Sequence, residues 1–246
     1  MSLTQQLSLR RSVKKMNNQI YLFDFYAVII SDSLNTESHS HLAHQITFSM
    51  NDEQFRVEID GEIIKDIVLF IPSGKSHKFL ESNSKYLSIL MDNESLFEIG
   101  ELKRKIEKLD TFPRNLEDVK SLVENLGIDK HKNIDPRIVK IKEMIEQTEC
   151  LENIRLNEIS KEILLSESRT LHLFKEQVGV PFRKYILWKK LKRAITLFAN
   201  SKDKKVTDIA LEAGFSDSAH LSKIIKSSFG ISPTEILKNS QFIKDH

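Results

Sequence analysis

The chain has 246 residues, of which 40% are hydrophobic and 29% charged, and its formal net charge is +2. The apolar fraction suffices for a buried core, and seven glycines and five prolines argue against a collagenous or disordered chain. A single cysteine excludes a disulfide framework, and no apolar run is long enough to cross a membrane, so we expect a cytoplasmic protein without membrane contact.

Five stretches rich in aromatic and β-branched residues predict the N-terminal strands. They are Ile20–Ile30, Phe48–Ser49, Gln54–Asp60, Ile63–Ile71 and Tyr86–Met91. Asp60-Gly61 predicts a hairpin turn between two of them. Strands spaced this closely favour an antiparallel sandwich or barrel.

Four of the eight histidines lie in this first part of the chain. His39, His41 and Gln45 alternate, so on a strand they would share one face, and His77 ends the later run Pro72-Ser73-Gly74-Lys75-Ser76-His77. The two motifs together resemble those of the cupin barrel, with a glutamine at Gln45 in place of the usual glutamate.

The cupin resemblance implies a divalent metal held by His39, His41, Gln45 and His77. Three imidazoles and one oxygen ligand suit Zn, Fe, Mn, Ni or Cu, although a neutral amide is a poorer ligand than a carboxylate. The alternative is that these side chains line the mouth of a barrel that binds a small molecule, together with aromatic residues such as Phe48 and Phe70.

Residues Ser95–Leu109 and Leu116–Leu126 carry apolar side chains every three or four positions, which predicts two helices. The first contains an apolar stripe of Ile99, Leu102, Ile106 and Leu109. This stripe can pair two subunits or pack on its own barrel, and the sequence leaves both open. The polar run 127–133 then predicts a linker.

Charge divides the chain in the same way. From Leu151 onward there are 17 Lys and Arg against 11 Asp and Glu, a charge of +6, and the first 150 residues hold 20 against 24, a charge of −4. A basic part beside an acidic part is typical of a polyanion-binding module fused to another domain. We therefore predict a barrel over 1–92, a helical dimerisation or linker segment over 93–133, and a separate helical domain over 134–246.

The helical domain is predicted to begin with Asp135 as the cap and Pro136 in the first turn. A helix-turn-helix follows, with a turn at Leu164-Leu165 and a second helix capped by Ser166. Its outward residues are Ser168, Arg169, Leu171, His172 and Lys175. A long helix over Phe182–Ala199 comes next.

Val206 to Gly230 predicts another helix-turn-helix, in which Gly214 makes the turn and Ser216 or Asp217 caps the second helix. The outward residues of that helix are Ser218, His220, Ser222, Lys223 and Lys226. None is acidic, and all can reach bases or phosphates in a major groove.

These two motifs resemble the duplicated helix-turn-helix of the AraC/XylS family of transcription regulators. The second motif matches through Ile209, Ala210, Gly214-Phe215-Ser216, Leu221, Lys223, Phe229-Gly230 and Pro233. The first matches through Ser166, Phe174, Gly179 and Tyr185. It departs at Ser160, where alanine is usual, and at Leu164, where glycine is usual, which weakens its turn signal.

The resemblance implies an α+β protein, with a cupin-like β-barrel and following helices at the N-terminus and an all-α double helix-turn-helix domain at the C-terminus. It further implies a sequence-specific regulator that is not an enzyme. Its expected partners are double-stranded DNA, RNA polymerase, a second copy of the chain and an unknown small-molecule effector. The rival hypothesis is a metal-dependent cupin enzyme carrying a DNA-binding tail.

Overall fold

The computed structural model describes residues 18–23, 26–33, 35–82, 84–92, 99–127, 135–148, 151–200 and 204–244. The polar linker after Gly127 and the start of the helix predicted from Ser95 lie outside the described residues. The domain boundary predicted at 92/93 borders the residues 93–98, which lie outside the described part of the chain. The boundary predicted at 133/134 falls within the residues 128–134, which also lie outside it.

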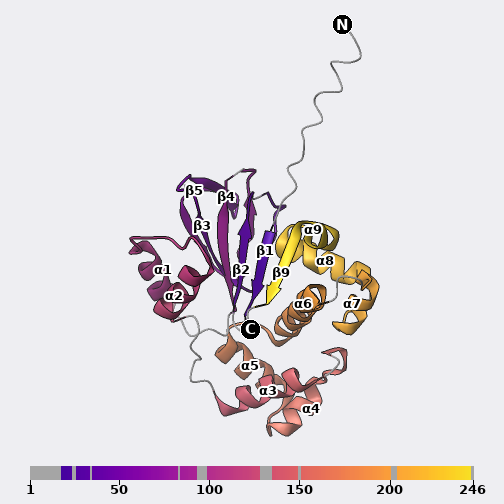
Figure 1. Cartoon of the computed structure of the whole chain (residues 1–246). Coiled ribbons are helices and arrows are strands. Elements are labelled where there is room, and N and C mark those ends of the chain that lie inside the picture. Colours follow the sequence, from indigo (N-terminus) through magenta and orange to yellow (C-terminus); the bar gives the residue numbers. More distant parts are fainter. Residues whose placement is uncertain are drawn as a thin grey trace, which may run out of the picture.

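The N-terminal part is built from two antiparallel sheets that face each other across a small apolar core (Figure 1). The larger sheet, in the order β6-β3-β8-β2-β1, consists of β1 (Asn18–Leu22), β2 (Tyr26–Ser31), β3 (His44–Ser49), β6 (Val68–Ile71) and β8 (Tyr86–Met91). The smaller, in the order β5-β4-β7, consists of β4 (Phe55–Ile59), β5 (Glu62–Asp66) and β7 (His77–Phe79). Among the described strands, no ladder joins the two sheets, so the cupin-like barrel is not closed.

Two of the predicted strands are each divided in two. Ile20–Ile30 forms the hairpin β1–β2, and Ile63–Ile71 breaks at Ile67, where the Asp66 carboxylate accepts the Ile67 amide at 2.7 Å. This break allows β5 and β6 to enter different sheets. The hairpin predicted at Asp60-Gly61 is confirmed between β4 and β5, with φ of 50° and 90°.

Helices α1 (Ile99–Glu107) and α2 (Leu116–Leu126) cover the outer face of the larger sheet. Leu102 and Ile106 are 1% and 5% exposed and pack against strand residues such as Phe48 and Ile89. Most of the apolar stripe therefore packs on its own sheet, which is one of the two alternatives left open by the sequence. Ile99 remains 41% exposed.

The C-terminal part contains two helix-turn-helix units joined by a long helix (Figure 1). Its helices are α3 (Pro136–Gln147), α4 (Leu156–Glu162), α5 (Glu167–Val178), α6 (Phe182–Asn200), α7 (Val206–Glu212), α8 (Ser218–Phe229) and α9 (Pro233–Asn239). The first half of α6 packs with α3, α4 and α5, and its second half packs with α7, α8 and α9. The long helix is thus shared by both cores and fixes their relative placement.

Local signals set the ends of these helices. The Ser166 hydroxyl accepts the Arg169 amide at 3.3 Å, and Asp217, rather than Ser216, caps α8 by accepting the His220 amide at 2.7 Å. Gly214 makes its turn with φ of +88°. At the corresponding turn of the first motif, Leu164 adopts φ of +55° with its side chain 90% exposed.

The C-terminal part is not purely helical, which corrects the all-α expectation. Strand β9 (Ser240–Lys244) pairs in parallel with β1 and adds a sixth strand to the larger sheet (Figure 1). Phe242 packs into the helical core, and β9 is held to β1 by backbone pairing, so its sequence gives no strand-like alternation.

Candidate functional site: recognition helices and an interdomain cavity

The outward side of α5 is exposed at every position predicted to contact DNA. Ser168, Arg169, His172 and Lys175 are exposed, and Leu171 is 38% exposed. The opposite side of the helix is buried in the first helical core, through residues such as Leu173 and Phe174. The helix therefore presents one polar and basic face that could lie in a major groove.

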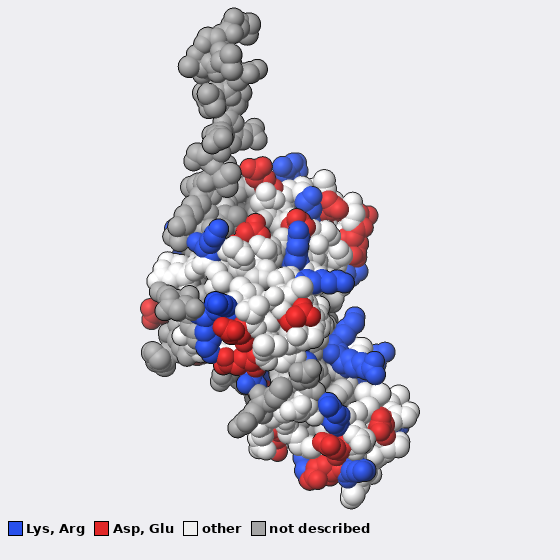
Figure 2. Space-filling view, turned by 90° about the vertical axis from the view of Figure 1, so that its right-hand side faces the viewer, with Lys and Arg blue, Asp and Glu red and all other residues white. Residues whose placement is uncertain are grey.

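The corresponding face of α8 is less exposed than that of α5. His220, Lys223 and Lys226 are exposed, while Ser218 and Ser222 are half-buried. The Ser222 hydroxyl donates to the Ser218 carbonyl at 2.7 Å. Figure 2, which views the molecule from the right of Figure 1, shows separate groups of basic side chains with acidic ones between them.

The C-terminal end of α8 is docked on the N-terminal part of the chain through the loop 36–41. The Ser40 amide donates to the Ser227 carbonyl at 3.0 Å, and the Glu37 amide donates to the Gly230 carbonyl at 3.2 Å. The Lys226 ammonium lies 3.0 Å from the Glu37 carboxylate. A lysine expected to contact DNA thus has an acidic partner within the same chain.

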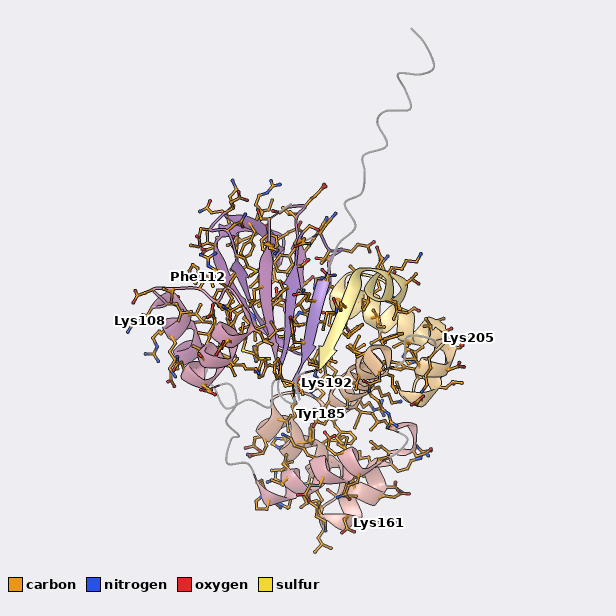
Figure 3. The ribbon with its side chains drawn as sticks, in the orientation of Figure 1. Lys108, Phe112, Lys161, Tyr185, Lys192 and Lys205 are labelled. Atoms are coloured by element: carbon orange, nitrogen blue, oxygen red, sulfur yellow. The ribbon has the colours of Figure 1, made fainter. Side chains whose placement is uncertain are left out.

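A second interdomain contact is centred on Asp92, which follows β8 and is 6% exposed. Its carboxylate accepts the indole N–H of Trp188 at 2.9 Å and pairs with the Lys192 ammonium at 2.6 Å. Figure 3 labels Lys192 on α6, where this helix meets the sheet. Buried charges need such partners, so Asp92 links the sheet to the helix that joins both DNA-binding motifs.

Between these contacts lies a cavity of about 200 Å³ that is lined by both domains. Its sheet side includes Ile29 and Leu90, and its helical side includes Leu191, Ile195 and Ile231. The wall is mainly apolar. Its polar lining includes a group formed by His39, His41, Gln45 and Ser88, and elsewhere also residues such as Asp92 and Lys192.

Two aromatic residues predicted to line the cavity lie elsewhere. Phe48 is fully buried beneath α1 and α2, and Phe70 packs against the same cluster. Strand alternation explains this placement, because Gln45 and Thr47 of β3 point to the cavity side while Ile46 and Phe48 point to the outer face. Two other aromatic residues that the sequence offers for this role, Tyr26 and Phe79, do line the cavity.

The structure brings His39, His41 and His77 together, although His39 and His41 precede the strand β3, which begins only at His44. His39 forms a single bridge opposite His77, and the three rings have centroid distances of 4.1 to 5.8 Å. One ligand nitrogen from each ring lies within 4.8 Å of the others. The predicted fourth member, Gln45, has its amide oxygen 3.0 Å from His41 Nε2.

Burial keeps these imidazoles neutral near pH 7. Burial, and then the nearby His77, lower the pKa of His39 to about 3 and that of His41 to about 4. Burial also lowers the pKa of His77. His44 has its pKa lowered to about 4 by burial, but it lies on the other side of β3, stacked on Phe70.

Comparison with known proteins identifies the helical domain. A family model described as a helix-turn-helix domain matches residues 159–239, which span most of α4 through α9. The Msm operon regulatory protein of Streptococcus mutans is 35% identical over 36% of this chain and 32% of that protein. The transcriptional activator RhaR of Mannheimia succiniciproducens is 28% identical over 72% of this chain and 76% of that protein. The region 159–239 therefore contains a helix-turn-helix domain similar to that of these regulators.

The likeness in fold extends to the N-terminal part of the chain. An apo variant of ToxT from Vibrio cholerae aligns with a TM-score of 0.54 and 14% identity over 88% of this chain and 98% of that chain. A second ToxT structure aligns with a TM-score of 0.51. The chain spans about a third of the length of the Streptococcus relative.

Sequence reasoning did not find the residues that join the two domains. Asp92 and Glu37 are unremarkable in sequence, and Gly230 was singled out only as part of the helix-turn-helix motif, since each acquires its role between the domains from a partner far along the chain. Trp188 packs in the second helical core and donates to Asp92 at the junction with the sheet. None of the helices in the described part of the chain is long and apolar enough to cross a membrane.

Proposed function

We propose that this protein is a transcription regulator that binds duplex DNA through α5 and α8 and is controlled by a small molecule in the interdomain cavity. The exposed faces of both helices support DNA binding, because Arg169, Lys175 and Lys223 can contact phosphates and base edges. Two recognition helices on one rigid linking helix suit successive major grooves, roughly 34 Å apart.

Control by a small molecule is supported by the wall of the cavity, to which both domains contribute. A molecule between Leu90 of the sheet and Ile195 of α6 contacts both domains at once. Its binding free energy therefore depends on how the domains sit relative to each other, which is the condition for a ligand to shift a conformational equilibrium. The lining favours a mainly apolar molecule whose polar end faces His39 and Gln45.

The family resemblance also leads us to propose that two copies act together, that they contact RNA polymerase, and that they work in the cytoplasm beside the DNA. The stripe containing Leu102 and Ile106 does not support pairing of two copies, since it is buried on its own sheet. Measurement of the oligomeric state in solution, with and without DNA, tests the pairing directly.

The residues that line the cavity give little support to the rival hypothesis of a metal-dependent enzyme. Catalysis there needs an acid or base beside the histidines. Among the described lining residues the carboxylate is that of Asp92, and it is already engaged by Trp188 and Lys192. Gln45 and Ser88, which lie beside the histidines, do not titrate near neutral pH.

Titration of the purified chain against duplex DNA from upstream of its own gene, beside a scrambled duplex and at two salt concentrations, tests the proposal. We expect selective binding that weakens steeply with salt. Arg169→Ala should weaken it, while Lys65→Ala, at an exposed position on β5, should leave it unchanged. Absence of binding to either duplex at low salt, with and without candidate ligands, would refute the proposed function.

A further inference from the structure

The histidine cluster has a hydrogen-bonding pattern that fixes the protons on its rings. In each of His39, His41 and His77, Nδ1 faces a backbone carbonyl two residues away. These carbonyls belong to Glu37, Ala43 and Lys75, at 2.8, 2.8 and 3.0 Å. A carbonyl can only accept, so a neutral His39 or His77 ring satisfies it by placing its proton on Nδ1 and leaving a lone pair on Nε2. In His41 the Ala43 carbonyl at 2.8 Å favours the same arrangement over the Gln45 Oε1 atom at 3.0 Å. Metal-binding imidazoles are commonly oriented in this way.

In two of the rings, those of His77 and His41, the Nε2 atom has an acceptor or nothing opposite it. His77 Nε2 is buried and has no hydrogen-bond partner among the described residues. His41 Nε2 lies 3.0 Å from Gln45 Oε1, which is also an acceptor. The Gln45 amide is directed this way because its NH2 group donates to Thr47 Oγ1 at 2.9 Å. Buried acceptors facing each other without a donor are unfavourable, and a cation between them removes that cost.

We propose that His39, His41 and His77, with Gln45 as an oxygen ligand, bind one divalent transition-metal ion, and that this ion controls the docking of α8 on the loop 36–41. Imidazole ligands select zinc, cobalt, nickel or copper over calcium and magnesium, which prefer oxygen. The three side chains are at most 7% exposed, so an ion there would be largely enclosed by protein. The cavity side of the cluster leaves space for a further ligand.

The link to α8 comes from the loop 36–41, which carries two of the three histidines and also docks the end of that helix. Glu37 shows the connection within one residue, since its carbonyl accepts His39 Nδ1 while its amide donates to the Gly230 carbonyl. His41 lies beside Phe229, with ring centroids 6.5 Å apart. An ion that fixes His39 and His41 therefore stabilises the docked loop, and with it the position of α8.

A cobalt titration of the full chain tests the metal site. We expect one Co²⁺ per chain, with the visible absorption of a nitrogen-rich four-coordinate site. His41→Gln and His77→Gln should each weaken binding at least about 100-fold. His44→Gln is the matched control, since His44 is similarly buried but its Nδ1 accepts the Ser73 amide at 3.1 Å on the other side of β3. Equal cobalt affinity in the wild type and His77→Gln, or no stoichiometric binding by the wild type, would overturn the site.

The control of α8 rests on the proposed DNA binding and is measured separately. Cobalt should change the affinity of the wild type for DNA at least several-fold and leave that of His77→Gln unchanged. Stoichiometric cobalt binding with no effect on a measurable DNA affinity would overturn the control while keeping the site. Failure to bind DNA under all conditions would count against the proposed function, and the emission of Trp188, which reports the interdomain contact, would then decide whether cobalt moves the domains.

Discussion

Replacing Gly230 with alanine should separate the recognition helix α8 from the N-terminal part of the chain without changing the outward face of the helix. Gly230 has φ of +70°, and a Cβ there would lie 2.6 Å from the Glu37 carbonyl oxygen and 2.8 Å from His39 Nδ1. Both atoms belong to the docked loop 36–41. Contacts this short cannot be kept, so the loop and the helix end must move apart.

The expected effect follows from what the movement breaks. The left-handed conformation itself costs alanine roughly 1–2 kcal/mol. Losing the Glu37–Gly230 and Ser40–Ser227 hydrogen bonds removes about 0.5–1.5 kcal/mol each, hence about 1–3 kcal/mol together. A coupling of that size changes the ratio of docked to undocked molecules roughly 5- to 150-fold.

Gly179→Ala provides the matched control. Gly179 ends α5 in the same left-handed way, with φ of +83°, but a Cβ there meets nothing within 4 Å. Both variants should therefore share the backbone strain, and only Gly230→Ala should lose the docking. Thermal melting and the emission of Trp188, the single tryptophan, measure the two effects. Equal melting temperatures and identical Trp188 emission in the two variants would refute the docking argument.

Leu164→Gly should stabilise the protein by about 1 kcal/mol, because the exposed leucine adopts a left-handed backbone conformation at the turn. The melting temperature should therefore rise by a few degrees, and an unchanged or lower melting temperature would contradict this. Lys223→Ala should weaken binding to the specific duplex more than to the scrambled one, and equal losses would show that Lys223 contacts only phosphates. His44 binds a proton in the unfolded chain near pH 6.5 but in the folded chain only near pH 4, so stability falls as pH falls through this window. His44→Gln should therefore reduce the loss of unfolding free energy between pH 7 and pH 5 by about 1–2 kcal/mol, and an unchanged loss would exclude this cause. Gln45→Glu should raise cobalt affinity at least about tenfold by supplying a carboxylate, and weaker binding would place Gln45 outside the metal site.

The helical domain could be predicted largely from the sequence because its signals are local. Ser166 and Gly214 mark a helix cap and a turn within one or two turns of the helices concerned, and apolar spacing identifies the buried face of each helix. The same local signal left a choice at α8, where Ser216 and Asp217 are adjacent candidates. Only the backbone geometry selected Asp217.

The tertiary structure decided the contacts that connect distant parts of the chain. Periodicity gives the two faces of a strand but not its neighbours, so the pairing of β9 with β1 and the division of Ile63–Ile71 between two sheets were not readable. The histidine motifs indicated which side chains could meet. Their meeting beside Gly230, at the end of a recognition helix, depends on backbone hydrogen bonds between segments nearly two hundred residues apart, and side-chain identity carries almost no information about such bonds.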